Sequence, residues 1–356
     1  MFKLRKPFAC AILLLASASA VRSSECDGWQ TRRPEWIFCD DFEKPGAMVG
    51  PGRYFEYNNN QGDFTTVPGV GVQSSTGLRA RWQPGEIDAG NIKLGFGRSP
   101  SAYFSKGIRP NSDFREIFYR VFVRMQSGWK GNPFKLSRAT VLAKADWSQA
   151  MIAHLWGDFG TGLQLDPARC TDGAGTVKCS GYNDFNNIKW IGAKAGTTPI
   201  YDGSHNDKWL CVEAHVRLND EGLANGVHEY WIDDKLEARR EGLDFLEGYK
   251  AYGINAVFLE NYWNSGSTQL QERFMDNFVV STQKIGCSET ATTPALPHPR
   301  HSIISPLQGA VQKLQAGVVE ISGKGGAVGT DGIWSAMGRI QAQSVDKAKS
   351  LIKTSE

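Results

Sequence analysis

The chain has 356 residues and a formal net charge of +3, and three of its basic residues, Lys3, Arg5 and Lys6, stand at the N-terminus. Without this leader the chain is close to neutral. The sequence therefore gives no electrostatic footprint for nucleic acid or for an anionic membrane, and neither is expected as a partner. An anionic ligand would have to be met by a local cluster of cations.

The first 20 residues have the three parts of a cleavable signal peptide. The basic start is followed by the short apolar run AILLLA and then by Ala18-Ser19-Ala20, which fits an A-x-A cleavage site. The apolar run is shorter than the roughly 20 residues that a membrane-spanning helix needs. We therefore expect a mature chain that begins near Val21 and is secreted or periplasmic.

The cysteines agree with export. Removal of the leader takes away Cys10 and leaves an even set of six, which predicts three disulfides without fixing their pairing: Cys26, Cys39, Cys170, Cys179, Cys211 and Cys287. Short spacing favours the pairs Cys26–Cys39 and Cys170–Cys179, which leaves Cys211 for Cys287. A zinc site is disfavoured, because no Cys-x-x-Cys pair occurs and no histidine stands at ligand spacing from a cysteine.

Between Cys26 and Cys287 the sequence predicts an all-β domain. Short alternating runs are separated by clusters of Gly, Asn, Asp and Pro. The clearest predicted strands are 117–125, 138–145, 150–156, 209–218, 226–233, 254–263 and 273–282. With this many strands, the economical architecture is a two-sheet β-sandwich of jelly-roll type.

The composition changes after Cys287. Residues 288–301 are rich in Thr and Pro and lack an apolar period, which predicts a linker. Further on, six apolar residues approximate the stripe of one short amphipathic helix: Ile333, Met337, Ile340, Val345, Ala348 and Ile352. The expected organisation is a signal peptide (1–20), a jelly-roll carbohydrate-active domain (21–287), and a linker with a C-terminal helical tail (288–356).

One predicted strand, 209–218, carries Glu213, His215 and Arg217 on the face opposite a row of apolar residues. An acid, an imidazole and a guanidinium in a row can bind a sugar or neutralise its carboxylate. A solvated strand face would carry the same charges, so both interpretations stay open.

A second group of candidates lies between 135 and 157, on what we expect to be two consecutive strands with Trp147 and Trp156 nearby. The polar members are Lys135, Arg138, Lys144, Gln149 and His154. Aromatic faces stack on pyranose rings while Arg and Lys pair with carboxylates, so this group suits an acidic sugar. The alternative is that the tryptophans belong to the core and that His154 is a satisfied buried histidine.

A third group is formed by Glu260, Tyr262 and Asn264, which alternate onto one strand face, with Trp263 opposite or at the strand end. Tyr262 is a candidate proton donor. Its phenol could pass a proton to a leaving oxygen if neighbouring cations lowered its pKa.

Two acidic motifs give weaker signals. Glu86 and Asp88 lack the second glutamate that a retaining glycoside hydrolase would need. Asp40 and Asp41 would lie near Asp276 if the first and last strands were adjacent, and Glu43 with them. This would allow a structural calcium ion, although charged strand ends explain the same residues.

The order of these features resembles the concanavalin A-like jelly roll of secreted polysaccharide lyases and their lectin relatives, from Trp36 to Cys287. The segments that carry the resemblance are DDFE, the KLSR strand after GWKGNPF, the run 209–236, INAVFLENYWNSGS and the closing RFMDNFVVST. The resemblance implies β-elimination on a uronic-acid-containing polysaccharide. In this reaction the substrate carboxylate is neutralised, a histidine or tyrosine removes the adjacent ring proton, and the leaving oxygen is protonated.

In such a lyase Arg138 and Gln149 would be the neutralising residues, His154 the base and Tyr262 the base or acid. The substrate would be bound by Lys135, Lys144, Glu213, His215, Arg217, Glu260 and Trp263. We expect a monomer that acts on an acidic polysaccharide without a cofactor, the calcium ion excepted. A non-catalytic lectin-like protein is the alternative, ahead of a glycoside hydrolase of the same fold.

Overall fold

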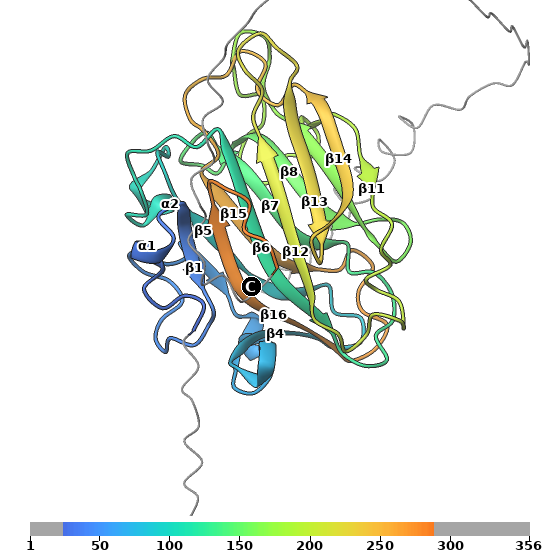
Figure 1. Ribbon diagram of the computed structural model, residues 1–356. Helices are drawn as coiled ribbons and strands as arrows, with labels where there is room; N and C mark the ends of the chain where they lie inside the picture. Colours follow the sequence, from blue (N-terminus) through green and yellow to red (C-terminus); the bar gives the residue numbers. More distant parts are fainter. Residues whose placement is uncertain (1–23, 288–356) are drawn as a thin grey trace, which may run out of the picture.

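A computed structural model describes residues 24–287 as two antiparallel eight-stranded sheets packed face to face (Figure 1). The predicted all-β jelly-roll sandwich is confirmed. The expected signal peptide, the linker and the C-terminal helix lie outside the described residues.

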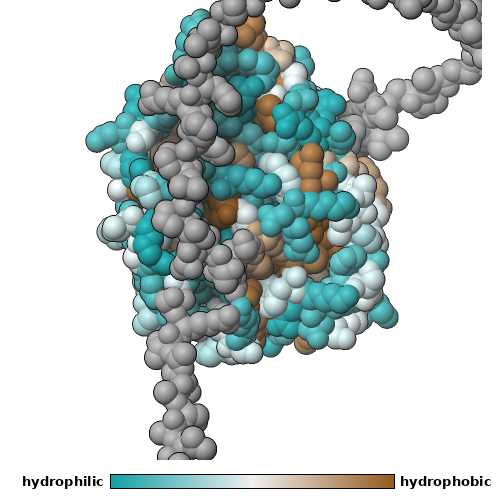
Figure 2. Space-filling view, viewed as in Figure 1, coloured by the Kyte–Doolittle hydropathy of each residue, from teal (hydrophilic) through white to brown (hydrophobic). Residues whose placement is uncertain are grey.

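The first sheet, named here the β6 sheet, has the order β14-β13-β12-β6-β16-β4-β3, and β1 also pairs with β16. Its strands are β1 (Trp36–Asp40), β3 (Phe64–Val67), β4 (Gly77–Trp82), β6 (Glu116–Met125), β12 (Leu210–Arg217), β13 (Gly226–Ile232), β14 (Lys235–Leu243) and β16 (Gln271–Ser281). In the view of Figure 1 this sheet lies in front, and Figure 2 shows apolar residues exposed among hydrophilic ones on the same face.

The second sheet, the β7 sheet, has the order β10-β9-β8-β7-β15-β5-β2, with β11 paired to β9. Its strands are β2 (Glu56–Asn58), β5 (Asp88–Gly95), β7 (Lys135–Leu142), β8 (Gln149–Gly157), β9 (Leu163–Arg169), β10 (Lys189–Trp190), β11 (Lys194–Ala195) and β15 (Ala256–Tyr262). The helices are short: α1 (Trp29–Arg32), α2 (Ala102–Ser105) and the 3-10 turns η1 (Asn60–Gly62) and η2 (Val72–Ser74).

The core lies between the sheets and is filled by alternate residues of each strand. On β12, the apolar row predicted from alternation is buried, from Leu210 through Val212 and Ala214 to Leu218. Burial of each large apolar side chain stabilises the fold by about 1.5–3 kcal/mol, which fixes the strand register and therefore which side chains face outward.

Three disulfides brace the sandwich, with the pairing that spacing favoured. Cys26–Cys39 joins the N-terminal segment to β1, Cys170–Cys179 closes the loop after β9, and Cys211–Cys287 ties the last described residue to β12. Such bonds are typical of proteins that mature in oxidising compartments. No helix within residues 24–287 is long and apolar enough to cross a membrane.

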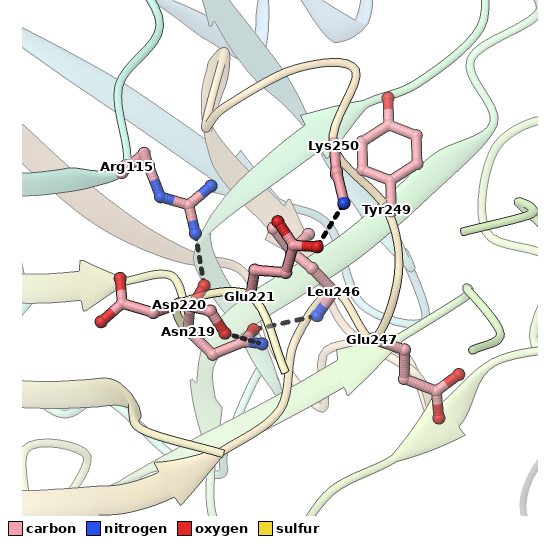
Figure 3. A pocket seen from close by; sticks show the side chains of 8 residues that line it. All are labelled: Arg115, Asn219, Asp220, Glu221, Leu246, Glu247, Tyr249 and Lys250. Carbon is pink, nitrogen blue, oxygen red and sulfur yellow. Dashed lines mark hydrogen bonds and ion pairs between the residues drawn. The ribbon is translucent and has the colours of Figure 1, made fainter. Parts of the chain in front are cut away.

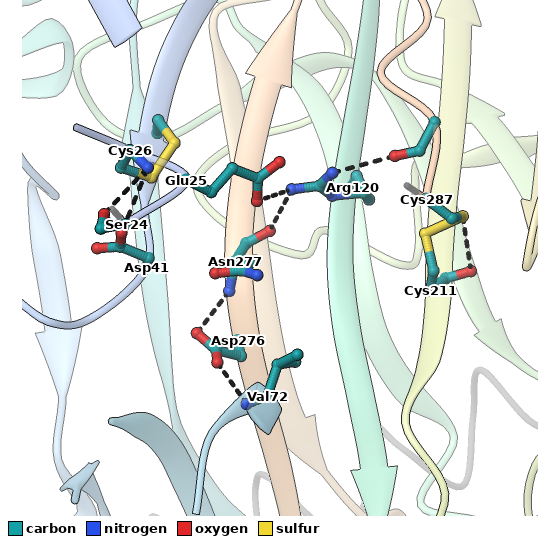
Figure 4. A network of polar contacts seen from close by, with 12 residues as sticks. Ser24, Glu25, Cys26, Asp41, Val72, Arg120, Cys211, Asp276, Asn277 and Cys287 are labelled. Atoms are coloured by element: carbon teal, nitrogen blue, oxygen red, sulfur yellow. Dashed lines mark hydrogen bonds and ion pairs between the residues drawn. A yellow bond between two sulfur atoms is a disulfide. The ribbon is translucent and has the colours of Figure 1, made fainter. Parts of the chain in front are cut away.

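The acidic residues of β1 and β16 lie close together, as expected from their pairing. Asp276 accepts hydrogen bonds from the Val72 N–H and the Ser75 hydroxyl, while Asp41 accepts one from the Cys26 N–H (Figure 4). Asp40 binds the Arg53 guanidinium. Within residues 24–287 no group of three or more His, Cys, Asp or Glu side chains is placed to hold a metal ion. The calcium ion stays a prediction.

Candidate functional site

Polar side chains gather on the outer face of the β7 sheet, where a bulge in β7 turns two cations to the same side. Lys135 pairs with Trp156 and Ser137 with Leu155, so Leu136 is the extra residue. Leu136 and Ser137 both face the core, and Lys135 and Arg138 both face outward toward the Trp156 ring. We name the candidate cluster by five residues: Lys135, Arg138, His154, Asp166 and Glu260.

Arg138 and Glu260 form a buried bidentate ion pair across β7 and β15. Arg138 Nε and Nη2 donate to the two carboxylate oxygens at 2.8 and 2.7 Å. The Tyr182 hydroxyl also donates to Glu260, at 3.0 Å, and the Asn183 side-chain oxygen accepts from Arg138 at 2.6 Å. Burial, the largest single cause, raises the pKa of Glu260, but the Arg138 guanidinium, Lys135 and the Tyr182 hydrogen bond together hold this pKa below its ordinary value. The charge of Arg138 is therefore neutralised within the protein.

Lys135 is the cation of the cluster without such a carboxylate clamp. Its Nζ lies 2.9 Å from the centroid of the Trp156 ring, and only 5% of the residue is exposed. Burial and, second, the charge of Arg138 place the pKa of this amine well below its ordinary value. An arriving carboxylate would favour the charged amine again.

His154 is held in one tautomer at the centre of the face. Its Nδ1 lies 2.9 Å from the carbonyl oxygen of Asp166, which can only accept, so Nδ1 carries the proton. Nε2 has no hydrogen-bond partner among the described residues. Burial, followed by the charges of Arg138 and Lys135, puts the pKa of His154 well below its ordinary value, so the ring is neutral at neutral pH.

Asp166 completes the cluster from β9, directly opposite His154 in the strand register. Burial raises the pKa of its carboxyl to about 7, against the lowering effect of Lys135. Asp166 was not among the site residues predicted from the sequence. The available signal was a lone acid inside the apolar alternation of LQLDPAR, in the strand next to the one that carries His154.

The loop between β9 and β10 covers the cluster. Tyr182 and Asn183 bind the Arg138–Glu260 pair, and the Phe185 ring lies 5.7 Å from Lys135 Nζ. None of these loop residues was predicted, because a strand pattern does not indicate which sheet face a distant loop will cross. His154 itself is 0% exposed, with the Trp156 and Trp190 ring centroids 3.7 and 5.5 Å from that of its imidazole.

Tyr262 lies two residues beyond Glu260 on β15, where its register partner is Asp88 of β5. Burial raises the pKa of its phenol, and the Asp88 carboxylate adds to the effect. The expectation that neighbouring cations lower this pKa is wrong. Asn58 donates to Asp88 at 3.2 Å, so Tyr262 faces a polar patch at the edge of the cluster.

Glu213, His215 and Arg217 face outward from β12, which belongs to the β6 sheet. The prediction that they line one cleft with Arg138 is therefore wrong. Glu213 accepts from the N–H groups of Ile285 and Gly286 and so holds the chain end. His215 lies between the Glu116 and Glu229 carboxylates, 2.7 Å from each. Alternation predicted the outward face correctly but could not tell which sheet the strand would join.

Three other predicted residues also lie outside the cluster. Trp263 is buried in the core, with its ring centroid 5.9 Å from that of Trp82, so it cannot line a cleft. Lys144 is exposed in the turn after β7. Gln149 pairs with Leu142 and donates to the Thr140 hydroxyl. Arg138 is opposite His154, whereas Gln149 is opposite Leu142, four residues further along β7. Gln149 therefore lies roughly 13 Å along the sheet from Arg138, and the two residues cannot neutralise the same substrate carboxylate.

A pocket of about 310 Å³ lies elsewhere, at the loops after β12 and β14 (Figure 3). Its polar groups bind one another: Arg115 donates to the carbonyl oxygen of Asn219, and Lys250 pairs with Glu221. None of the predicted site residues lines this pocket.

No protein-family model matches the sequence, and no curated protein matches it. Similar solved structures include an endo-β-1,4-glucuronan lyase from the fungus Trichoderma reesei, with a TM-score of 0.47 and 12% identity over 70% of this chain and 96% of that one. A PL-14 alginate lyase from Aplysia kurodai gives 0.46 and 10% over 70% and 99%. The binding domain of botulinum neurotoxin serotype D/C gives 0.40 and 11% over 71% and 50%. Similarity at this level carries no argument about substrate or reaction, which we base on the residues of this chain.

Proposed function

We propose that this protein is an exported polysaccharide lyase that cleaves a uronic-acid-containing polysaccharide by β-elimination. The observation that carries the proposal is the His154 ring: neutral, fixed in one tautomer, and on the same sheet face as the Lys135 amine and the Arg138–Glu260 ion pair. A lone pair on Nε2 is what a general base needs, and the Lys135 amine suits the anion that forms when the ring proton leaves.

The reaction assigns one step to each group. His154 Nε2 takes the proton from the ring carbon next to the substrate carboxylate, and the electron pair forms the new carbon–carbon double bond. The bond to the leaving oxygen breaks, and we assign the proton that this oxygen takes to Tyr262. Tyr262 lies four residues along β15 from Phe258, which is level with Arg138 and His154, so substrate binding must bring Tyr262 and His154 closer together. Lys135 pairs with the substrate carboxylate and stabilises the negative charge that develops there.

Two findings change the roles expected from the sequence. Glu260 occupies two donors of the Arg138 guanidinium, so Lys135 is the cation that neutralises the substrate carboxylate. Arg138 acts instead through its electric field, which adds to burial in keeping His154 neutral. The raised pKa of Tyr262 excludes a phenolate base at neutral pH, so the role left to its phenol is that of proton donor, although a raised pKa makes it a weaker acid than the sequence analysis assumed.

The location and partners follow from the same proposal. A disulfide-braced domain behind an expected signal peptide is secreted or periplasmic, where it meets glycans as a monomer. Its partner is an acidic polysaccharide.

The test is to incubate the full mature chain with alginate, glucuronan and glycosaminoglycans and to follow ultraviolet-absorbing unsaturated products. His154→Gln and Tyr262→Phe should each lower kcat by about 10²–10⁴-fold. Lys144→Ala, which changes an exposed cation outside the cluster, should leave kcat unchanged. Absence of unsaturated products across the panel would refute the proposal.

The second candidate is a non-catalytic lectin-like protein, favoured by the occupation of the Arg138 guanidinium by Glu260. It predicts glycan binding without products, and binding that survives His154→Gln and Tyr262→Phe. A glycoside hydrolase would release saturated reducing ends instead, but the buried Glu260 is committed to Arg138.

A further inference from the structure

Arg273 is a buried cation directly beneath the candidate cluster. It belongs to β16 of the β6 sheet, is 0% exposed, and crosses the core to the β7 sheet. Nη1 donates to the carbonyl oxygen of Lys135 at 3.1 Å and Nη2 to that of Glu260 at 2.6 Å. Nε donates to the Asn261 side-chain oxygen at 3.1 Å.

These acceptors lie where β7 and β15 separate. The pairing of the two strands ends at Ser137 and Leu259, so the carbonyl groups of Lys135 and Glu260 lie past the last pair of the ladder. A buried carbonyl without a partner is costly, and the planar guanidinium supplies donors to both strands at once. Arg273 thus links β7 and β15 where they have separated, as backbone hydrogen bonds link them from Ser137 and Leu259 onward.

Burial of an arginine in the core costs desolvation free energy. No carboxylate within residues 24–287 forms an ion pair with Arg273, and burial lowers its pKa to about 10, so the side chain stays charged at neutral pH. An apolar residue of similar volume would avoid desolvation of this charge. The geometry therefore indicates a task that an apolar residue could not perform.

We propose that Arg273 is a positioning residue of the candidate site, which holds the backbone of Lys135 and of Glu260 at a fixed separation from beneath the sheet. Through these two carbonyl groups it sets where the Lys135 amine and the Arg138–Glu260 pair stand. The kinetic part of this inference rests on the proposed lyase activity, while the structural part does not.

The experiment compares Arg273→Met and Arg273→Lys with a matched control, Arg120→Met. Arg120 is also a buried arginine, 1% exposed, and it also donates to backbone carbonyl groups. Its acceptors are the carbonyl groups of Asn277 and Gly286, which lie outside the candidate cluster (Figure 4). Amide hydrogen exchange is measured at 135–138 and 260–262 in each folded variant, and kcat and KM on the substrate that the panel identifies.

Arg273→Met should speed exchange at 135–138 and 260–262 by at least tenfold beyond the average change in the sheets, and Arg120→Met should not. The kcat of Arg273→Met should fall by about 10²-fold with a smaller change in KM, as expected when reacting groups are misplaced by about 1 Å. Arg273→Lys, which keeps the charge and part of the donor set, should recover part of both effects.

The proposal is overturned if Arg273→Met folds and keeps wild-type exchange in these segments, or if the kcat of Arg273→Met is unchanged. If the wild-type protein forms no unsaturated product, the lyase proposal fails, and the exchange measurement alone decides whether Arg273 positions these residues. If Arg273→Met does not fold, Arg273→Lys supplies the same comparison.

Discussion

His154 and Asp166 lie opposite each other on β8 and β9, and burial moves the pKa of both toward the neutral form. The imidazole pKa falls, so the ring loses its proton, and the carboxyl pKa rises, so the acid keeps one. The cluster is thus less charged than its residue types suggest. This suits a site that must bind an anion and then remove a carbon-bound proton from it.

Asp166 should make the protein less stable as the pH rises. Its pKa is 3.8 in its ordinary state and about 7 in the fold, so between these values the folded state holds a proton that the unfolded state has released. The stabilisation is complete below about pH 4 and lost by pH 7, a change of up to about 4 kcal/mol. Asp166→Asn should therefore be more stable than wild type at pH 8 and similar to it at pH 4.

Urea unfolding of both proteins at pH 4 and pH 8 measures this difference. Asp276, whose pKa burial also raises to about 7, is present in both proteins and cancels. Asp207→Asn serves as the control, because that side chain is 61% exposed. A stability difference for Asp166→Asn that does not grow with pH would contradict the burial argument.

Some residues of the cluster could be predicted from the sequence, and the reason lies in residue type and spacing. Lys135, Arg138 and His154 stand on consecutive strands, and Glu260 belongs to a strand with strong alternation. Gln149 was chosen wrongly, because its distance from Arg138 depends on the register between β7 and β8, which bulges shift at two points. Strand periodicity does not reveal such shifts.

At the scale of elements, the loop after β9 decides access to the cluster. Tyr182 and Asn183 contact Arg138 and Glu260, and His154 is fully buried beneath the same face. The rings of Trp156 and Trp190 also lie beside His154, so a polysaccharide can reach it only if these rings or the loop move. The Cys170–Cys179 disulfide closes the first part of the loop and limits that movement.

Removal of this disulfide should loosen the loop without unfolding the sandwich. In the Cys170→Ser, Cys179→Ser double variant, we expect faster protease cleavage within 171–188, because the bond no longer restricts the loop. Limited proteolysis with mass spectrometry measures the cleavage rate. Equal rates in wild type and variant would show that the other contacts of the loop, such as those of Gly181, Tyr182 and Asn183, hold it without the disulfide.

Gly90 shapes the other edge of the cluster. In β5 it has φ +88°, and the register shift beside it brings Asp88 opposite Tyr262. A Cβ atom at this position would lie 2.4 Å from Phe64 Cβ and 2.5 Å from the Asn58 carbonyl oxygen. Gly90→Ala therefore combines backbone strain with a steric clash, and should lower the free energy of unfolding by about 2–4 kcal/mol.

Gly85→Ala is the matched control. Gly85 has a similar φ of +81°, but no heavy atom outside its chain neighbours lies within 4 Å of a Cβ built there, so only the strain of about 1–2 kcal/mol remains. Chemical unfolding of the two variants compares them. Equal losses would mean that the strand relaxes away from Phe64 and Asn58.

At the scale of the whole molecule, alternation predicted the sandwich because each strand buries one face, and the core residues of β12 follow that pattern. It could not assign β12 to the β6 sheet, since the pairing of β12 with β6 joins residues far apart in the sequence. This is why Glu213 and His215 were placed in the wrong cleft. The pairing of β1 with β16, which the sequence analysis considered only as a condition for a calcium site, brings the two ends of the described chain together.

Both ends of the described segment, 24–287, contact the outer face of the β6 sheet. Arg120 binds the Glu25 carboxylate near the start of the described chain and the carbonyl oxygen of Gly286 near its end (Figure 4). The Cys211–Cys287 disulfide fixes the same C-terminal segment to β12 across a sequence separation of 76 residues. These contacts connect both ends of the described segment to strands β6 and β12 of the same sheet.

Cys211→Ser with Cys287→Ser should therefore cost more stability than loss of the Cys170–Cys179 bond. The entropy that a disulfide removes from the unfolded chain grows with the loop that it closes, and the separations are 76 and 9 residues. We expect a loss of about 4 kcal/mol for the first pair and about 3 kcal/mol or less for the second. Guanidinium unfolding of both double variants under oxidising conditions measures the losses.

The Cys211 variant should still fold, because Glu213 keeps the backbone hydrogen bonds to Ile285 and Gly286. A smaller loss for this pair than for Cys170–Cys179 would show that the C-terminal segment is held by these hydrogen bonds, with little contribution from the disulfide.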